Sequence, residues 1–215
     1  MTLPFTKDQF LDIFQQYNYS LGLAVLVLWL FTVGTIVFWL FSNRVNDKWL
    51  VVLLIIHWLW AGFLYHIFYF AHINPVAYLF GILFIIQAVL LYWFGIKNTR
   101  LRFVATLRGW SMIAIALVIY SLAYPFVGLA LEFQYPRLAT FGVPCATTLL
   151  TAGLLLTTAP PAPRSVLIIP IIWSFIGGSA AYLLHIYQDW LLLVAAILML
   201  AFIAIPGAKI FSKSI

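Results

Sequence analysis

Charged residues and cysteine are both scarce in this 215-residue chain. Only 7% of the residues are charged and 66% are hydrophobic, which excludes an ordinary soluble globular domain. The single cysteine excludes an intramolecular disulfide and any zinc site built from several cysteines. The first 18 residues have no basic start and carry Asp8 and Asp12 instead, so we expect no cleaved signal peptide.

Long apolar runs make up most of the chain, and its mean hydropathy is +1.11. We predict an all-α membrane protein, a bundle of seven transmembrane helices that forms a single domain over residues 1–215. Each run has about 20 residues, which as a helix matches the hydrocarbon thickness of a bilayer. The expected spans are 19–41, 49–71, 75–95, 103–124, 140–159, 166–187 and 190–210.

Lys and Arg between these runs indicate the orientation. Basic residues concentrate in the cytoplasmic loops of membrane proteins, so the richer side predicts the cytoplasm. We therefore expect the N-terminus outside and the C-terminus in the cytoplasm, and no nucleic-acid partner for the basic charge. The richer side holds Arg44, Lys48, Lys97, Arg100, Arg102, Arg108, Arg164, Lys209 and Lys213, and the other side holds Lys7 and Arg137.

Two segments are expected to contact the membrane surface. Residues 1–18 predict a short interfacial helix, in which Thr6 and Gln9 fit a capping box before an apolar face. The cytoplasmic run Lys97–Arg102 is expected to contact anionic lipid headgroups. Membrane lipids are thus the partners that the sequence indicates directly.

His57 and Gln87 are polar residues near the middle of the second and third spans. The two spans are joined by a very short turn, so they are antiparallel neighbours and place both side chains at similar depth. An interhelical hydrogen bond between them is the favoured interpretation, worth about 0.6 kcal/mol in membranes. A proton or substrate pathway is the alternative.

A second group of polar residues lies in the outer third of the predicted bundle. Intramembrane ionisable groups are costly, so each predicts a partner or a function. We predict that they line a ligand pocket near the outer surface, with the connector 125–139 as a lid. The candidate ligand-binding residues are His66, His72, Asn74, Cys145, Thr148, His185 and Asp189.

Imidazole and thiol groups at one membrane face also suit a transition metal or haem. His66, Cys145 and His185 are the weak metal candidates. No CxxC, HxxxH or HExxH spacing supports such a site. We therefore predict no cofactor and keep metal or haem as an alternative.

The sixth span carries a face of small residues, which permits close approach of another helix. This packing surface serves either the chain itself, a second copy in a homo-oligomer, or a partner subunit. Its residues are Ser174, Gly177, Gly178 and Ala181.

Short segments distributed over nearly the whole chain carry a family resemblance. They are Leu3-Pro4-Phe5-Thr6, Tyr65-His66, Ile73-Asn74-Pro75, Tyr135-Pro136, Phe141-Gly142-Val143-Pro144-Cys145, Ile176-Gly177-Gly178-Ser179-Ala180-Ala181 and Gln188-Asp189. They resemble an uncharacterised family of bacterial polytopic membrane proteins, a domain of unknown function, although Ala146 stands where the family pattern has a second proline. The resemblance implies no established activity; we expect a multi-pass protein of the bacterial cytoplasmic (inner) membrane.

The favoured function is binding or transport of a small ligand through the outer pocket. One alternative is a metal- or haem-dependent membrane enzyme or redox protein. Another is a structural or accessory subunit of a membrane complex. We assign no catalytic residue.

Overall fold

The computed structural model describes residues 3–42, 46–106, 109–131 and 133–204. These residues form seven α-helices, joined by turns and short π- and 3-10-helical segments, and contain no β-strand. The all-α prediction is therefore confirmed. In chain order the elements are α1 (Lys7–Phe41), α2 (Asp47–Trp60), η1 (Ala61–Tyr69), η2 (Phe70–His72), α3 (Ala77–Leu91), η3 (Tyr92–Lys97), α4 (Trp110–Ala130), α5 (Pro144–Leu156), α6 (Arg164–Leu184), η4 (Tyr187–Trp190) and α7 (Leu191–Ala204).

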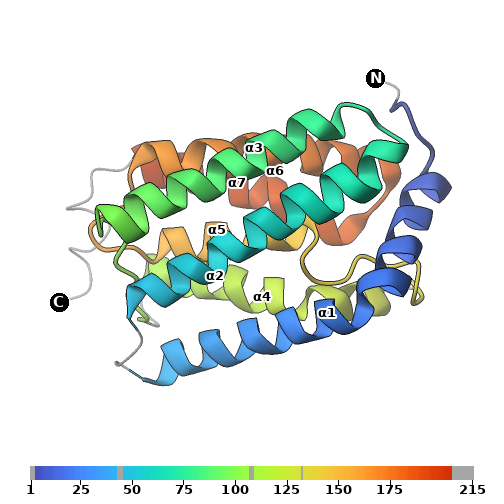
Figure 1. Ribbon diagram of the computed structural model, residues 1–215. Helices are drawn as coiled ribbons and strands as arrows, with labels where there is room; N and C mark the ends of the chain where they lie inside the picture. Colours follow the sequence, from blue (N-terminus) through green and yellow to red (C-terminus); the bar gives the residue numbers. More distant parts are fainter. Residues whose placement is uncertain (1–2, 43–45, 107–108, 132, 205–215) are drawn as a thin grey trace.

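Helix α1 is one 35-residue helix rather than an interfacial helix followed by a separate span. Its start agrees with the predicted capping box: Thr6 Oγ1 accepts from the Gln9 backbone N–H at 3.2 Å, and Gln9 Oε1 accepts from the Thr6 N–H at 2.8 Å. Figure 1 shows the first coils of α1 turned across one end of the bundle and the rest running along its side. The N-terminal part thus caps the bundle end as a continuation of the first span.

Six helical stretches are long and apolar enough to cross a membrane among the described residues. The fifth expected span, 140–159, is different. It forms α5, a helix of 13 residues in which every residue except Cys145 is buried. At 1.5 Å per residue this helix is about 20 Å long, shorter than a hydrocarbon core of about 30 Å. Seven predicted spans therefore become six long helices around a short central one.

Contacts with α2, α4, α6 and α7 surround α5. Pro144 begins this helix, where its missing N–H costs no hydrogen bond. On the side facing α4, Gly153 permits very close packing, because a Cβ there would lie 2.6 Å from a methyl carbon of Val118. The centre of the bundle is therefore a protein-packed helix.

Helix α4 begins seven residues later than the expected span 103–124 and continues past Pro125 to Ala130. Residues 103–106 are not helical, and Phe103 instead pairs with Thr158 in an isolated β-bridge. The Phe103 N–H also donates to the carboxylate of Asp47 at 3.0 Å. These long-range bonds override the apolar character that predicted a helix there.

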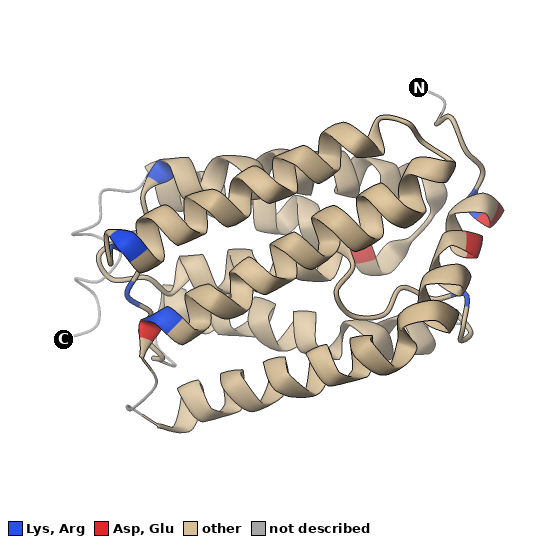
Figure 2. Ribbon diagram, in the orientation of Figure 1, with Lys and Arg blue, Asp and Glu red and all other residues tan. Residues whose placement is uncertain are grey.

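Charge separates the two ends of the bundle in Figure 2. The end where α2 begins and α6 begins carries most of the described Lys and Arg, while the end where α1 begins carries Asp8 and Asp12 with Arg137. Arg44, Arg108, Lys209, Lys213 and the last residues of the span 190–210 lie outside the described residues. The basic residues at the first end lie at the start of α2 (Lys48), at the end of η3 and just after it (Lys97, Arg100, Arg102) and at the start of α6 (Arg164).

Candidate functional site

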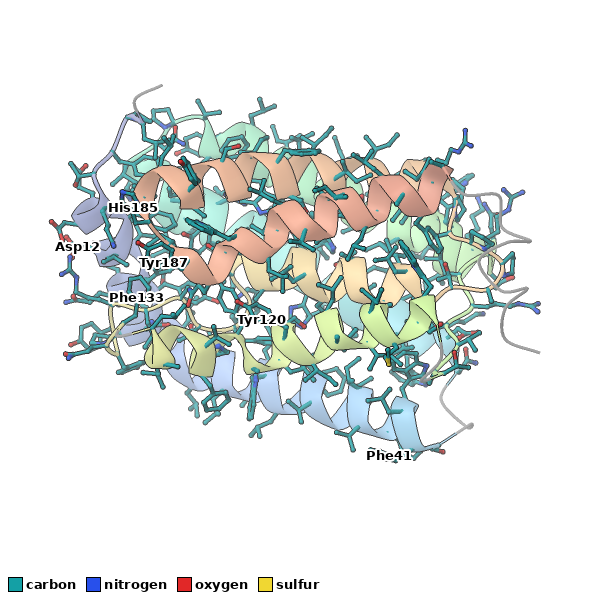
Figure 3. All side chains as sticks on the ribbon, turned by 180° about the vertical axis from the view of Figure 1, so that it is seen from behind. Asp12, Phe41, Tyr120, Phe133, His185 and Tyr187 are labelled. Carbon is teal, nitrogen blue, oxygen red and sulfur yellow. The ribbon has the colours of Figure 1, made fainter. Side chains whose placement is uncertain are left out.

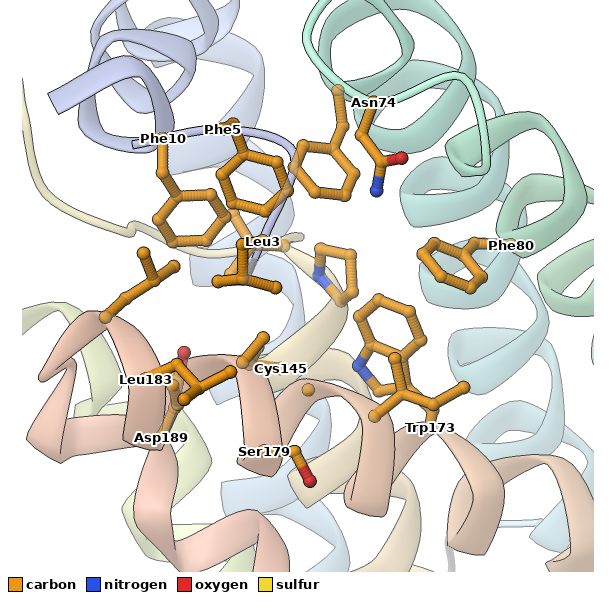
Figure 4. Close-up of a pocket in the computed structure, with 18 of the residues that line it drawn as sticks. Leu3, Phe5, Phe10, Asn74, Phe80, Cys145, Trp173, Ser179, Leu183 and Asp189 are labelled. Carbon is orange, nitrogen blue, oxygen red and sulfur yellow. The ribbon is translucent and has the colours of Figure 1, made fainter. Parts of the chain in front are cut away.

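A cavity of about 420 Å³ lies at the end of the bundle where α1 begins. Four parts of the chain enclose most of it: the N-terminal segment (residues 3–14), residues 65–74 after α2, the start of α5 and the second half of α6. Figure 4 shows Phe5, Phe10 and Leu3 on one side and Trp173 and Phe80 on the other. Nearly all of its walls are aromatic or aliphatic side chains.

The N-terminal wall is an aromatic group held by ring contacts. The ring of Phe5 stacks on Phe10 at a centroid distance of 5.8 Å and meets the edge of Phe70 at 5.3 Å. Phe10 in turn contacts Phe14 at 4.8 Å. Because the capping box begins α1 just after Phe5, it directs Phe10 and Phe14 from the same helical face into this wall.

The α6 wall reaches the outside of the bundle. Phe175 and Leu183 line the cavity, yet they are 43% and 42% exposed on the outer surface of the helix. Ile176 and Ser179 lie between them along the same lining. The cavity therefore borders the face of α6 that no other described element covers.

Polar groups collect at the base of the cavity. Asp189 lines it and is only 2% exposed. The hydroxyl group of Tyr124, on α4, donates a hydrogen bond to Asp189 Oδ1. The thiol of Cys145, at the start of α5, interacts with the Asp189 carboxyl group and with Tyr124. Three elements far apart in the sequence thus supply one polar base.

The chain turns sharply before Asp189, and this turn positions the carboxyl group. Helix α6 ends at Leu184, and the next residue, His185, has a φ of 55°, in the left-handed region. The backbone N–H of Asp189 then donates to the Ile186 carbonyl at 3.0 Å. Tyr120 anchors the same turn from α4 by donating to the Gln188 carbonyl at 2.7 Å.

The structure brings together three of the seven candidate ligand-binding residues. Asn74, Cys145 and Asp189 line the cavity. His72 and His185 are exposed, and His72 Nδ1 lies 3.1 Å from the Tyr69 carbonyl oxygen. Figure 3 shows His185 at the surface of the bundle end that also carries Asp12. The predicted grouping is therefore only partly what the structure contains.

His66 and Thr148 are buried beside the cavity rather than in its lining. The imidazole of His66 lies edge-on to the rings of Phe84 and Trp173, at centroid distances of 4.7 and 4.8 Å. Neither of its ring nitrogens, nor the hydroxyl group of Thr148, has a hydrogen-bond partner among the described residues. His66 contacts the cavity only through Trp173 and the rings around it.

The predicted hydrogen bond between His57 and Gln87 is wrong. His57 Nε2 lies 2.9 Å from the hydroxyl group of Thr32 on α1. Gln87 Nε2 donates instead to the Val166 carbonyl on α6 at 2.8 Å. His57 faces α1 and Gln87 faces α6, because the rotation of each helix about its axis is set by packing.

Metal candidates are not gathered in the described part of the chain. No three His, Cys, Asp or Glu side chains there are placed to hold a metal ion. His66 is enclosed by aromatic rings, Cys145 lines the cavity and His185 is exposed. These three residues do not share one site in this fold.

The small-residue face of α6 packs against α7 of the same chain. A Cβ added to Gly178 would lie 2.7 Å from the side chain of Leu193, and one added to Gly177 would lie 3.1 Å from Leu192. Ser174 and Ala181 on the same face are also buried. The close helix approach predicted for this face is therefore used within the chain.

Two features of the site were missed from the sequence. No described residue of the connector 125–139 lines the cavity, whereas the N-terminal segment does. The loop is instead fastened to α1, where Asn18 Nδ2 donates to the carbonyls of Pro136 and Leu138 at 2.7 and 2.8 Å. Tyr124 was also not assigned to the pocket, although its position near the outer end of its span matches the depth of Asp189.

These features define an all-α protein whose six long helices have the length and composition of membrane spans, with an apolar cavity at one end. A family model of unknown function (DUF6064) matches residues 7–209, so the chain belongs to that family. The match confirms the resemblance to an uncharacterised family. No curated protein and no solved structure matches this chain.

Proposed function

We propose that this protein is a multi-pass membrane protein that binds an amphipathic small molecule from the surrounding lipid, in the cavity between the N-terminal segment and α6. The observation that supports this most is the lining itself: apolar walls reach the outer face of α6, and the polar groups of Asp189 and Cys145 lie at the base. A volume of about 420 Å³ falls within the range of small-molecule sites.

Exposed apolar side chains support the lipid environment. Leu23 is 78% exposed and Val27 59% exposed on α1, and Val89 is 58% exposed on α3. In water such surfaces would drive association, whereas in a bilayer they face hydrocarbon. A ligand therefore reaches the α6 side of the cavity from the hydrocarbon phase.

The proposed orientation places the cavity in the outer half of the bacterial cytoplasmic membrane. The basic end of the bundle, with Lys48, Lys97 and Arg164, faces the cytoplasm under the positive-inside rule. Lys97 Nζ lies 4.0 Å from the centre of the Trp93 ring, an arrangement suited to the interface where anionic headgroups lie. The cavity lies at the opposite end.

The polar base decides which molecule binds. The apolar walls hold an alkyl tail by packing contacts, which are much the same for tails of equal length. Selectivity must therefore come from groups such as Cys145 and Asp189, which hydrocarbon does not supply. We propose binding rather than transport, because the residues that line the cavity all lie at one end of the bundle.

A photoreactive dodecyl chain tests this proposal. Membranes containing the full chain are irradiated with the probe, and the labelled peptides are mapped by mass spectrometry. We expect labelling on the N-terminal wall and on the cavity side of α6. Ala180→Trp places a large side chain in the lining and should lower labelling by roughly tenfold, the effect of losing about 1.4 kcal/mol of binding.

Ile172→Trp is the matched control, since Ile172 is 41% exposed on α6 and does not line the cavity. It should leave labelling of the cavity peptides unchanged. The proposal would be refuted if the cavity peptides were labelled equally in the Ala180→Trp and Ile172→Trp variants. Labelling spread evenly over all lipid-facing helices would also refute it.

A further inference from the structure

The lining of the cavity is unbalanced in charge. It contains one carboxyl group, that of Asp189, and no Lys, Arg or His among the described residues. A carboxylate or phosphate headgroup at the base would meet Asp189 with no cation to offset it. Like charges in a site of low polarity repel strongly, because little water is present to screen them.

Trp173 adds a hydrogen-bond donor that has no strong acceptor. This side chain lines the cavity and is only 7% exposed, yet its Nε1–H has no hydrogen-bond partner among the described residues. Its polar neighbour is the sulfur of Cys145, a weak acceptor. Buried donors in native proteins are nearly always paired, so this N–H calls for an acceptor from a bound molecule.

Asp189 has the opposite need. It accepts a hydrogen bond from Tyr124 and interacts with the Cys145 thiol, and a carboxylate offers about four lone-pair sites over its two oxygens. The hydroxyl proton of Tyr124 is committed to this bond, so that group presents only its oxygen to a ligand. A ligand that donates to Asp189 would use the acceptor capacity that Tyr124 leaves free.

We infer that the occupant of this cavity is an uncharged lipid alcohol, whose hydroxyl group donates to Asp189 and accepts from the Trp173 indole. This inference rests on the proposed function and names its ligand class. A carboxylate can accept from Trp173 but cannot donate to Asp189. An ammonium group can donate to Asp189 but leaves the Trp173 N–H unpaired. Of these three heads, the hydroxyl group alone meets both needs.

Competitive native mass spectrometry of the purified full chain tests this inference. Dodecanol, dodecanoate and dodecylamine are offered together at equal concentration, so that the tails are identical and only the heads differ. We expect dodecanol to occupy the protein about tenfold more than either competitor. Higher occupancy by dodecanoate or by dodecylamine overturns the inference.

Two tryptophan variants locate the effect. Trp173→Phe keeps an aromatic ring in the wall but removes the N–H, and should reduce the preference for dodecanol over dodecylamine by roughly tenfold. Trp190→Phe is the control, because Trp190 is 41% exposed and does not line the cavity. An unchanged preference in Trp173→Phe also overturns the inference.

Failure of this inference is separable from failure of the proposed function. The photoreactive dodecyl chain carries no head that must be recognised, so its labelling reports on the apolar walls alone. Labelling of the walls together with an amine or carboxylate preference rejects only the lipid alcohol. Absence of wall labelling rejects the proposed function itself.

Discussion

Gly153→Ala tests whether α5 is packed as tightly as the structure describes. The added Cβ would lie 2.6 Å from Val118 Cγ2 and 2.9 Å from both the Ala114 carbonyl oxygen and the Val118 nitrogen. Side-chain atoms can rotate away from such a contact, but backbone atoms move only with their helix. The substitution therefore requires α4 and α5 to separate.

Gly34→Ala on α1 supplies the matched control, because a Cβ there has no atom within 4 Å. Both glycines are interior helix positions. Replacing Gly by Ala inside a helix gains about 1 kcal/mol from backbone entropy, and this gain is common to the two variants. The difference in stability between the two variants therefore measures the cost of overpacking, which is about 1–3 kcal/mol.

We expect Gly153→Ala to be less stable than Gly34→Ala by about 1–3 kcal/mol. The assay is unfolding in mixed micelles at increasing fractions of denaturing detergent, followed by circular dichroism. Equal stability of the two variants would refute the close contact between α4 and α5. So would a Gly153→Ala variant more stable than the control.

Three further outcomes are expected. Tyr124→Phe removes the hydrogen bond to buried Asp189 and should lower the free energy of unfolding by about 1–3 kcal/mol in the same assay; an unchanged value would contradict the contact. Asn18→Ala removes two bonds to loop carbonyls, so limited proteolysis should cut that loop faster than in the wild type, and an equal rate would count against the anchor. In a background without the native cysteine, Arg137→Cys should react with an impermeant maleimide added to intact cells, whereas Lys97→Cys should react only after permeabilisation; the reverse pattern rejects the proposed orientation.

Local features of the fold could be predicted from the sequence with little error. The capping box at Thr6 and Gln9 sets the start of α1, because its hydrogen bonds join residues three apart. Pro144 marks the start of α5 for an equally local reason. The predicted start at residue 103 failed because Phe103 bonds to residues more than 50 positions away.

The candidate site was predicted in part, by depth alone. Counting residues from the turns placed Cys145 and Asp189 at one end of the bundle, and both line the cavity. The same count grouped His185 with them, although it is exposed. Depth along a helix follows from sequence position, but the direction in which a side chain points depends on the helix packing.

Hydrophobic runs and the distribution of charge by themselves determined that the chain is helical and apolar, with most Lys and Arg at one end. Both properties depend on stretches of neighbouring residues in the sequence, so they can be obtained without the folded structure. Tertiary structure decided that α5 is enclosed by protein instead of lipid, that His57 contacts Thr32, and that Tyr124 bonds Asp189. There are two physical reasons. Hydropathy measures the preference of a residue for apolar surroundings and does not distinguish lipid from protein side chains. The rotation of a helix about its axis is fixed only when the helices pack together.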